Sequence, residues 1–326
     1  MEVSIRYTKV KITMKIYLIT SNPQISGAME GELKSLGDLI VINAQKMSAS
    51  DVIAKAGDAE ILIAGSSGIE KISRELLSGM KVLKMIATLT VGVAWVDIEA
   101  AKELGIKICN IKGANAESVA EHAWGMVLDL AKRITEFDRD SRNKGAFKFA
   151  NYTGKEVYGK TIGIIGLGDI GSKVARIAAA FDMKVLGFNR SKKSLPNVEQ
   201  VDLEALLKNS DVIITTVPLT EETTNMISDK EIALMKNGVI LINPAMEPIT
   251  NKEAVLKGLE SGKIFGFGIE TEIMKPVPAD SPYFKHSRIV VTPHNAFNTE
   301  DANIKSYALA IDNVKAFINE APQNVV

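Results

Sequence analysis

The residues best placed to do chemistry in this sequence are three glycines in one short loop and a histidine near the C-terminus. Gly166, Gly168 and Gly171 follow the apolar run TIGII. His294 follows the apolar run RIVVTP. Glycines at this spacing let a strand turn tightly into a helix and let a phosphate approach the backbone. Histidine is the side chain that most readily moves a proton near neutral pH. The pattern indicates a nucleotide site and a candidate acid or base.

The glycine loop GLGDIG stands between an apolar strand pattern and an amphipathic helix pattern. A helix N-terminus offers free N–H groups and the positive end of a dipole to phosphates. The expected cofactor contacts here are Gly166, Gly168, Asp169, Ile170 and Gly171. The alternative is that the glycines serve packing alone, since glycine-rich strand ends also occur in sheets that bind nothing.

The end of the next strand pattern indicates which nucleotide is bound. An NAD site places an acid there to bind the ribose hydroxyls, but this chain has Asn189, Arg190 and Ser191. Arginine can grip a 2′-phosphate through two hydrogen bonds, whereas an acid would repel it. NADP(H) is therefore favoured over NAD(H). The alternative is that these residues form only a solvated loop.

The bulk composition excludes several classes of protein. The 326 residues carry 39 Lys and Arg against 39 Asp and Glu, so no net charge favours nucleic acid or an anionic membrane. No apolar run is long enough to span a bilayer, and the N-terminus lacks a signal-peptide pattern, so we expect a cytoplasmic protein. The single cysteine excludes a disulfide framework, and no residues are spaced as metal ligands.

Short apolar strand patterns alternate with helix patterns along most of the chain. One series begins at Met14, and a second begins at Thr161 after a long helix expected over 117–139 and a polar connection. A final helix is expected over 300–319. Strand and helix in alternation predict parallel sheets covered on both faces, and the length suits two domains. The fold class is therefore α/β, with two Rossmann-like, doubly wound domains.

Five stretches in order, GANAESVAEHAWGMVL, GKTIGIIGLGDIGSKVA, TTVPLTEETTNMI, LINPA and TPHNAF, resemble the D-2-hydroxyacid dehydrogenase family. The resemblance runs from Met14 to the C-terminus. It implies an oxidoreductase acting on a small 2-keto or 2-hydroxy acid, and a homodimer. It also implies a nucleotide domain, residues 114–291, inserted into a substrate domain made of residues 1–113 and 292–326.

The resemblance also implies roles for single residues. His294 would pass the proton, and backbone N–H groups at Val91 and Gly92 would hold the substrate carboxylate. Asn115 would lie beside the active cleft. Cofactor contacts are implied for Val217, Pro218, Thr223, Asn243 and Glu270, with Glu270 binding the nicotinamide amide.

Two positions depart from the family pattern. Met246 stands where the family has the arginine that binds the substrate carboxylate, and Lys275 stands where it has the acid that pairs with the histidine. A thioether can neither pair with a carboxylate nor donate a hydrogen bond. An ammonium beside His294 would favour a neutral imidazole, whereas an acid would favour the charged form.

Three interpretations follow from these departures. The protein turns over with Lys275 supplying the positive charge for the substrate, or it is a catalytically impaired sensor or partner-binding protein. In the third, Glu247 or Glu272 folds back to pair with His294. Of the other histidines, His122 is expected in a core or interface and His286 on the surface. Trp124 is a candidate dimer contact, and Trp95 is expected to line the substrate pocket or to pack between domains.

Overall fold

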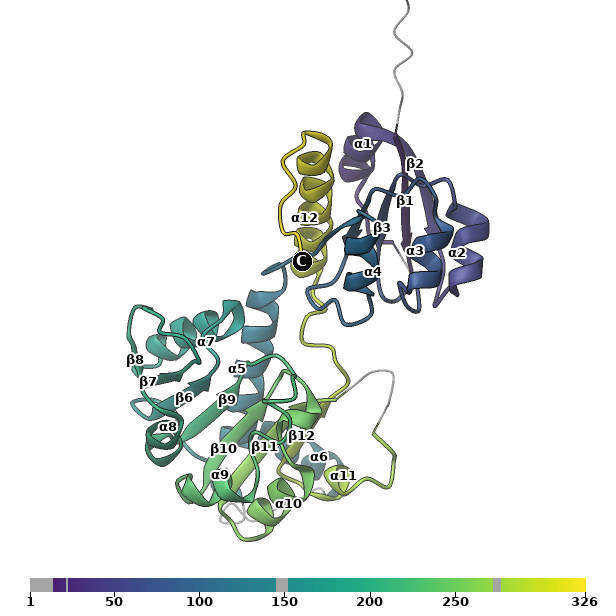
Figure 1. The fold of residues 1–326 in the computed structure, drawn as a ribbon. Coiled ribbons are helices and arrows are strands. Elements are labelled where there is room, and N and C mark those ends of the chain that lie inside the picture. The colour runs from purple at the N-terminus through teal and green to yellow at the C-terminus, as the bar shows by residue number, and fades with distance from the viewer. Residues whose placement is uncertain (1–13, 22, 145–151, 272–276) are drawn as a thin grey trace, which may run out of the picture. The chain divides into compact units, whose positions relative to one another are not determined.

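The computed structural model describes residues 14–21, 23–144, 152–271 and 277–326, which form two compact units (Figure 1). Unit 1 contains the chain up to Ala114 together with Glu300–Val326. Unit 2 contains Asn115–Thr299 and is inserted in unit 1. The expected boundary at 113/114 lies within one residue of the first of these divisions. The expected boundary at 291/292 falls inside unit 2 instead, because the segment that follows its last strand is tied to unit 2 by hydrogen bonds given below.

Unit 1 is built on a five-stranded parallel sheet with the order β2-β1-β3-β4-β5, which is a doubly wound order. Its strands are β1 (Met14–Thr20), β2 (Gly37–Asn43), β3 (Ile61–Ala64), β4 (Met85–Thr88) and β5 (Lys107–Cys109). Its helices are α1 (Gly27–Leu36), α2 (Ala49–Ala56), α3 (Arg74–Gly79), α4 (Ile98–Glu103) and α12 (Glu300–Ile318).

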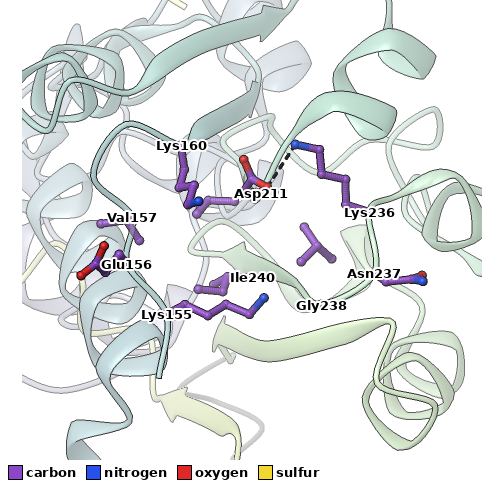
Figure 2. A pocket seen from close by; sticks show the side chains of 11 residues that line it. Lys155, Glu156, Val157, Lys160, Asp211, Lys236, Asn237, Gly238 and Ile240 are labelled. Atoms are coloured by element: carbon purple, nitrogen blue, oxygen red, sulfur yellow. Dashed lines mark hydrogen bonds and ion pairs between the residues drawn. The ribbon is translucent and has the colours of Figure 1, made fainter. Parts of the chain in front are cut away.

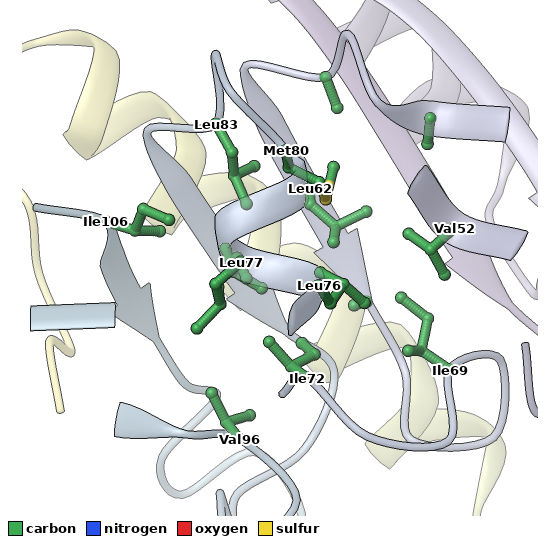
Figure 3. Packing of buried hydrophobic residues seen from close by; sticks show 14 of the residues in the cluster. Val52, Leu62, Ile69, Ile72, Leu76, Leu77, Met80, Leu83, Val96 and Ile106 are labelled. Carbon is green, nitrogen blue, oxygen red and sulfur yellow. The ribbon is translucent and has the colours of Figure 1, made fainter. Parts of the chain in front are cut away.

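Both faces of this sheet are covered, which explains why every residue of β3 and β4 is buried. On one face, Val52 of α2 and Leu76 of α3 pack against Leu62 of β3 (Figure 3). On the other face, Leu33 of α1 and Ile311 of α12 pack against the sheet. The C-terminal helix is therefore part of the unit 1 core.

A buried asparagine fixes α12 where the chain returns to unit 1. Asn313 is 0% exposed, and its Nδ2 donates to the carbonyl of Asn110 at 2.9 Å. Its Oδ1 accepts from Nδ2 of Asn324 at 2.8 Å. These two bonds join α12 to the end of β5 and to the C-terminal tail.

Unit 2 is built on a seven-stranded parallel sheet with the order β12-β11-β10-β9-β6-β7-β8. The order in which the chain adds strands reverses between β6 and β9, which pair in parallel. Its strands are β6 (Thr161–Ile165), β7 (Lys184–Phe188), β8 (Val198–Gln200), β9 (Val212–Thr215), β10 (Val239–Asn243), β11 (Ile264–Glu270) and β12 (Ile289–Thr292). Its helices are α5 (Ala116–Lys132), α6 (Ile134–Lys144), α7 (Asp169–Ala180), α8 (Leu203–Asn209), α9 (Asp229–Leu234), α10 (Lys252–Glu260) and α11 (Pro282–Lys285), with a 3-10 turn, η2 (Glu247–Ile249).

The helix expected over 117–139 is two helices. Arg133 adopts a left-handed conformation with φ of 58°, which ends α5. The Asp129 carboxylate then accepts from the N–H and the hydroxyl of Thr135 at the start of α6. An apolar stripe does not reveal this break, because a single left-handed residue changes direction without changing the pattern before it.

Helices cover both faces of the unit 2 sheet. On one face, α5 packs over β10 and β11 and α7 over β6 and β7. On the other face, α8 packs over β6 and β7 and α10 over β11, with α9 between these two helices. Trp124 of α5 is 5% exposed, and its ring centroid lies 4.9 Å from that of Phe181. The suggestion that Trp124 marks a dimer contact is therefore wrong, since its ring is enclosed within unit 2.

The glycine loop joins β6 to α7 at very close range. Gly166 has φ of +103°, which favours glycine. A Cβ at Gly171 would lie 2.0 Å from the Gly166 carbonyl oxygen and 2.9 Å from Thr216 Oγ1. A Cβ at Gly168 would meet no atom within 4 Å. Gly171 is therefore needed for packing, while Gly168 borders open space.

We predict that Gly171→Ala destabilises the protein by about 1–3 kcal/mol, because α7 must move away from the Gly166 backbone. Urea unfolding of the whole protein measures the loss. Gly168→Ala is the matched control, and its stability should stay within about 1 kcal/mol of the parent. Equal losses in the two variants would contradict this account of the loop.

Candidate functional site

The candidate residues of unit 2 gather at one edge of its sheet. The strands are parallel, so the segments that follow them leave at their carboxyl ends, where α/β sheets bind ligands. These segments begin at Gly166 after β6, Asn189 after β7, Val217 near the end of β9, Met246 near the end of β10 and Pro293 after β12, and Glu270 is the last residue of β11.

The glycine loop has the form of a phosphate cradle. Gly168 is the N-cap of α7 and no side chain caps the helix there, so the first N–H groups face the space beside Gly168. Asp169 is exposed and Ile170 is half-buried in the first turn. Thr216 donates its hydroxyl to the carbonyl of Gly166 at 2.7 Å, which holds the turn open. The residues present fit a pyrophosphate.

The segment after β7 is held in place by side chains from two elements. Asn189 accepts from the N–H of Leu167 at 3.1 Å and donates to the carbonyl of Ser191 at 2.9 Å. Gln200 of β8 donates to the carbonyl of Ser191 at 3.1 Å and accepts from the N–H of Lys193 at 2.8 Å. The loop is therefore shaped before any ligand binds.

Arg190 extends from this ordered loop into solvent. Its side chain is 89% exposed, and Nη1 lies 3.1 Å from Oε2 of Glu222, which is 76% exposed. An ion pair this exposed contributes little to stability. The guanidinium is therefore available to a stronger anionic partner.

The loop after β9, expected to lie on the adenine side, is shaped by its own threonine. Val217 is half-buried and Pro218 is exposed. The Thr223 hydroxyl donates to the carbonyl of Pro218 at 2.7 Å and accepts from the N–H of Thr220 at 2.7 Å. Thr223 closes the loop with the hydroxyl that was expected to contact the cofactor.

Asn243 differs more clearly from its expected role as a cofactor contact. Its side chain is 0% exposed, accepts from the Thr215 hydroxyl at 3.0 Å and donates to the carbonyl of Met246 at 2.8 Å. The buried amide offers no surface to a cofactor. It fixes the backbone at Met246, whose side chain is half-buried.

His294 stands in a turn that is tied to Glu270. The histidine is half-buried, has φ of 50°, and its ring lies 5.8 Å from that of Phe297 in an edge contact. The Glu270 carboxylate is 3% exposed and accepts from the Thr292 hydroxyl and the Ala296 N–H. Both oxygens that were expected to serve the nicotinamide amide are thus engaged within the protein.

The partners proposed for His294 are only partly described. Lys275 and Glu272 lie outside the described residues. Glu247 begins the turn η2, and no described hydrogen bond or ion pair joins it to His294.

In unit 1, the expected carboxylate loop follows β4. The Val91 carbonyl accepts from Asn110 Nδ2 at 2.8 Å, and the Gly92 carbonyl accepts from the Thr90 hydroxyl at 2.8 Å. Within the described parts of the chain, the N–H groups of Val91 and Gly92 have no acceptor. Both are therefore free to bind an anion.

Trp95 and Asn115 have structural roles within their own units. Trp95 is half-buried against the unit 1 core and donates its indole N–H to the Thr90 hydroxyl at 3.0 Å, so it supports the loop. Asn115, the first residue of unit 2, is the N-cap of α5 and makes no side-chain cap bond.

A cavity of about 330 Å³ lies elsewhere in unit 2, at the amino ends of β6, β9 and β10 (Figure 2). Lys155, Lys160 and Lys236 line it, and Lys236 is paired with Asp211 at 3.0 Å. Because the glycine loop and His294 leave the opposite ends of these parallel strands, the cavity is separate from the candidate site.

Sequence reasoning missed several residues that shape the site. His122, expected in a core or interface, has 25% of its side chain exposed and places Nε2 3.2 Å from Glu270 Oε1. Ser118, Thr216 and Gln200 were also not singled out. The available signal was weak: Ser118 and His122 are polar, four residues apart and on the same face of α5. His286 is half-buried rather than exposed, and burial, with Arg288, lowers its pKa.

Among the described residues, every helix is too short or too polar to cross a bilayer. No three His, Cys, Asp or Glu side chains there come together as a metal site.

The chain is similar to the following three proteins, among others. The hydroxypyruvate reductase of Thermotoga maritima is 35% identical over 80% of this chain and 85% of its own. The glyoxylate reductase of Thermofilum pendens is 32% identical over 96% and 94%. A solved structure of an acyclic imino acid reductase in complex with NADPH and D-Arg has a TM-score of 0.86 and 27% identity, over 96% of this chain and 100% of that one.

The family model described as D-isomer specific 2-hydroxyacid dehydrogenase, NAD binding domain, matches residues 124–296, more than half of the chain. That range contains the glycine loop, Glu270 and the turn that carries His294. With these relatives and the two parallel-sheet units, the match shows that this chain belongs to the D-isomer specific 2-hydroxyacid dehydrogenase family of oxidoreductases.

Proposed function

We propose that this protein is an NADP(H)-preferring oxidoreductase that interconverts a small 2-keto acid and its D-2-hydroxy acid, with His294 transferring the proton. The observation that carries the cofactor preference is the loop after β7. It places the nearly fully exposed guanidinium of Arg190 where an NAD site has an acid, on a backbone held by Asn189 and Gln200.

The binding of the dinucleotide follows from the residues of unit 2. The N–H groups at the start of α7 would hold the pyrophosphate in the space beside Gly168. Arg190 would leave the exposed Glu222 for the doubly charged 2′-phosphate, because a charge-assisted bidentate contact is stronger than that pair. The reduced nicotinamide, when bound, supplies a hydride.

The substrate side of the proposal uses backbone donors. The N–H groups of Val91 and Gly92 have no acceptor among the described residues and would bind the substrate carboxylate. His294 would give a proton to the carbonyl oxygen as it gains charge. Lys275 would supply the positive charge that Met246 cannot, although a lysine lacks the two-point grip of an arginine.

A second candidate rests on Met246. Its backbone is fixed by Asn243 and its side chain has no charge, so nothing at this position can bind a carboxylate as an ion pair. On this reading the protein binds the nucleotide but is a sensor or partner-binding protein. The expected homodimer stays a prediction.

We predict that Arg190→Ala raises the Kd for NADPH by about 10-fold to 100-fold and leaves the Kd for NADH within about twofold. Fluorescence titration of both cofactors measures this difference. Glu222→Gln is the matched variant and should tighten NADPH binding, because it removes the competing carboxylate. An equal loss of both cofactors in Arg190→Ala would contradict the NADP(H) preference.

We predict that the protein reduces glyoxylate, hydroxypyruvate or phenylpyruvate with NADPH, and that His294→Ala lowers kcat by about 10²-fold to 10⁴-fold. NADPH absorbance at steady state measures both. A parallel assay with ammonium present tests the imine of each keto acid, since one structural neighbour is an imino acid reductase.

NADPH binding without reduction of any keto acid would contradict the enzyme proposal and support the sensor. In that case Met246→Arg with Lys275→Glu should create activity, because it restores both side chains of the family pattern.

A further inference from the structure

The end of β11 carries a buried carboxylate whose partners all belong to unit 2. Glu270 is 3% exposed. Its Oε1 accepts from the Thr292 hydroxyl and lies 3.2 Å from Nε2 of His122. Its Oε2 accepts from the N–H of Ala296 at 3.1 Å. A buried acid with this many donors has a structural task of its own.

Two of the partners of Glu270 lie on either side of His294 in the chain. Thr292 precedes the histidine by two residues and Ala296 follows it by two. The Ala296 carbonyl also accepts from the Ser118 hydroxyl at 2.6 Å. The Thr292 hydroxyl lies 3.0 Å from Nε2 of His122. The turn is thus held at both ends.

The anchoring side chains come from two elements. Ser118 and His122 are four residues apart on α5 and so share one face of that helix. Glu270 comes from β11. The turn that carries His294 is therefore fastened to a helix and a strand of the unit 2 core.

The turn itself needs such fastening. His294 has φ of +50°, a conformation that is unfavourable for a residue with a side chain and persists only where its surroundings impose it. Pro293, Asn295 and Phe297 are exposed, and Ala296 is the buried residue of this stretch. Burial of apolar side chains in the turn therefore contributes little to fixing the position of His294.

The charge of Glu270 strengthens the anchor. Burial raises the pKa of its carboxyl, but hydrogen bonds from His122, Thr292 and the Ala296 amide outweigh burial and bring the pKa below its ordinary value. The group is ionised at neutral pH, and hydrogen bonds to an ionised acceptor are the stronger kind. A proton on Nε2 of His122 suits both of that atom's oxygen neighbours.

We propose that Glu270 and His122 are positioning residues that set the orientation of His294, and that Glu270 does this in place of binding the nicotinamide amide. Ser118 and Thr292 complete the anchor. The proposal rests on the role of His294 proposed above, since only then does the orientation of its ring affect the reaction.

The test compares Glu270→Gln, His122→Leu and His122→Gln. Glutamine at 270 keeps the size but replaces one accepting oxygen with a donor, which cannot accept from Ala296 or Thr292. Leucine at 122 removes the donor. Glutamine at 122 keeps a donor near the position of Nε2 and should therefore restore the anchor of the turn.

The first readout needs no cofactor and no activity. The chain has three histidines, so the ring signals of His294 can be assigned by NMR after isotope labelling. Glu270→Gln and His122→Leu should shift the His294 ring signals and speed hydrogen exchange of the Ala296 amide. His122→Gln should restore both toward the parent. This arm tests the anchor even if no keto acid is reduced.

The second readout is the split between kcat and KM. Both disrupting variants should lower kcat by about 10-fold to 100-fold, because a misplaced proton donor slows the chemical step. The KM for keto acid and the Kd for NADPH should change by less than about twofold. His286→Gln, which lies outside the anchor, is the matched control and should change none of these quantities.

Three outcomes would overturn the proposal. The first is unchanged His294 and Ala296 signals in Glu270→Gln. The second is a loss of NADPH affinity of about 10-fold or more with the Ala296 amide still protected, which would assign Glu270 to the cofactor. The third is a change in the KM for keto acid with kcat left unchanged. If Glu270→Gln does not fold, Ser118→Ala, which removes one bond to Ala296, takes its place in every readout.

Discussion

The seven strands of the unit 2 sheet all run the same way, so each segment with a candidate functional residue leaves the sheet at the same edge. The reversal of strand order between β6 and β9 opens that edge beside the glycine loop. The side chains that hold these segments are mostly not the ones that would touch a ligand. Asn243, Gln200 and Glu270 each bind backbone groups of a neighbouring loop. The candidate site is thus shaped by polar contacts within unit 2.

The sequence predicted what depends on local pattern. The two parallel-sheet units, the glycine loop and the place of His294 after an apolar strand follow from spacing and alternation, and all are found. Contacts between segments far apart in the sequence could not be predicted from spacing and alternation. His122 and Glu270 are far apart in the chain and meet only when α5 packs beside β11. The break at Arg133 and the boundary at Thr299 depend on single conformations and tertiary bonds that no periodicity records.

Met246 and Lys275 depart from the family pattern, and of the two Met246 lies among the described residues. Met246 occupies a backbone position that Asn243 holds firmly, so the change there is one of chemistry alone. In unit 1, the N–H groups of Val91 and Gly92 have no acceptor among the described residues, which is why we propose them as donors to the substrate carboxylate. Without an arginine at position 246, the proposed reaction depends on such backbone donors and on the orientation of His294, which the proposed anchor around Glu270 would set.

We infer that this variant site still carries out hydride transfer. The most direct measurement is mass spectrometry of the product formed by the wild-type protein from a 2-keto acid and NADPH deuterated at C4 of the nicotinamide. We expect a 2-hydroxy acid that carries one deuterium at C2 when the deuterium occupies the transferred position. A protein that binds the labelled NADPH and yields no labelled product from either C4 isomer, with any of the keto acids, would contradict it.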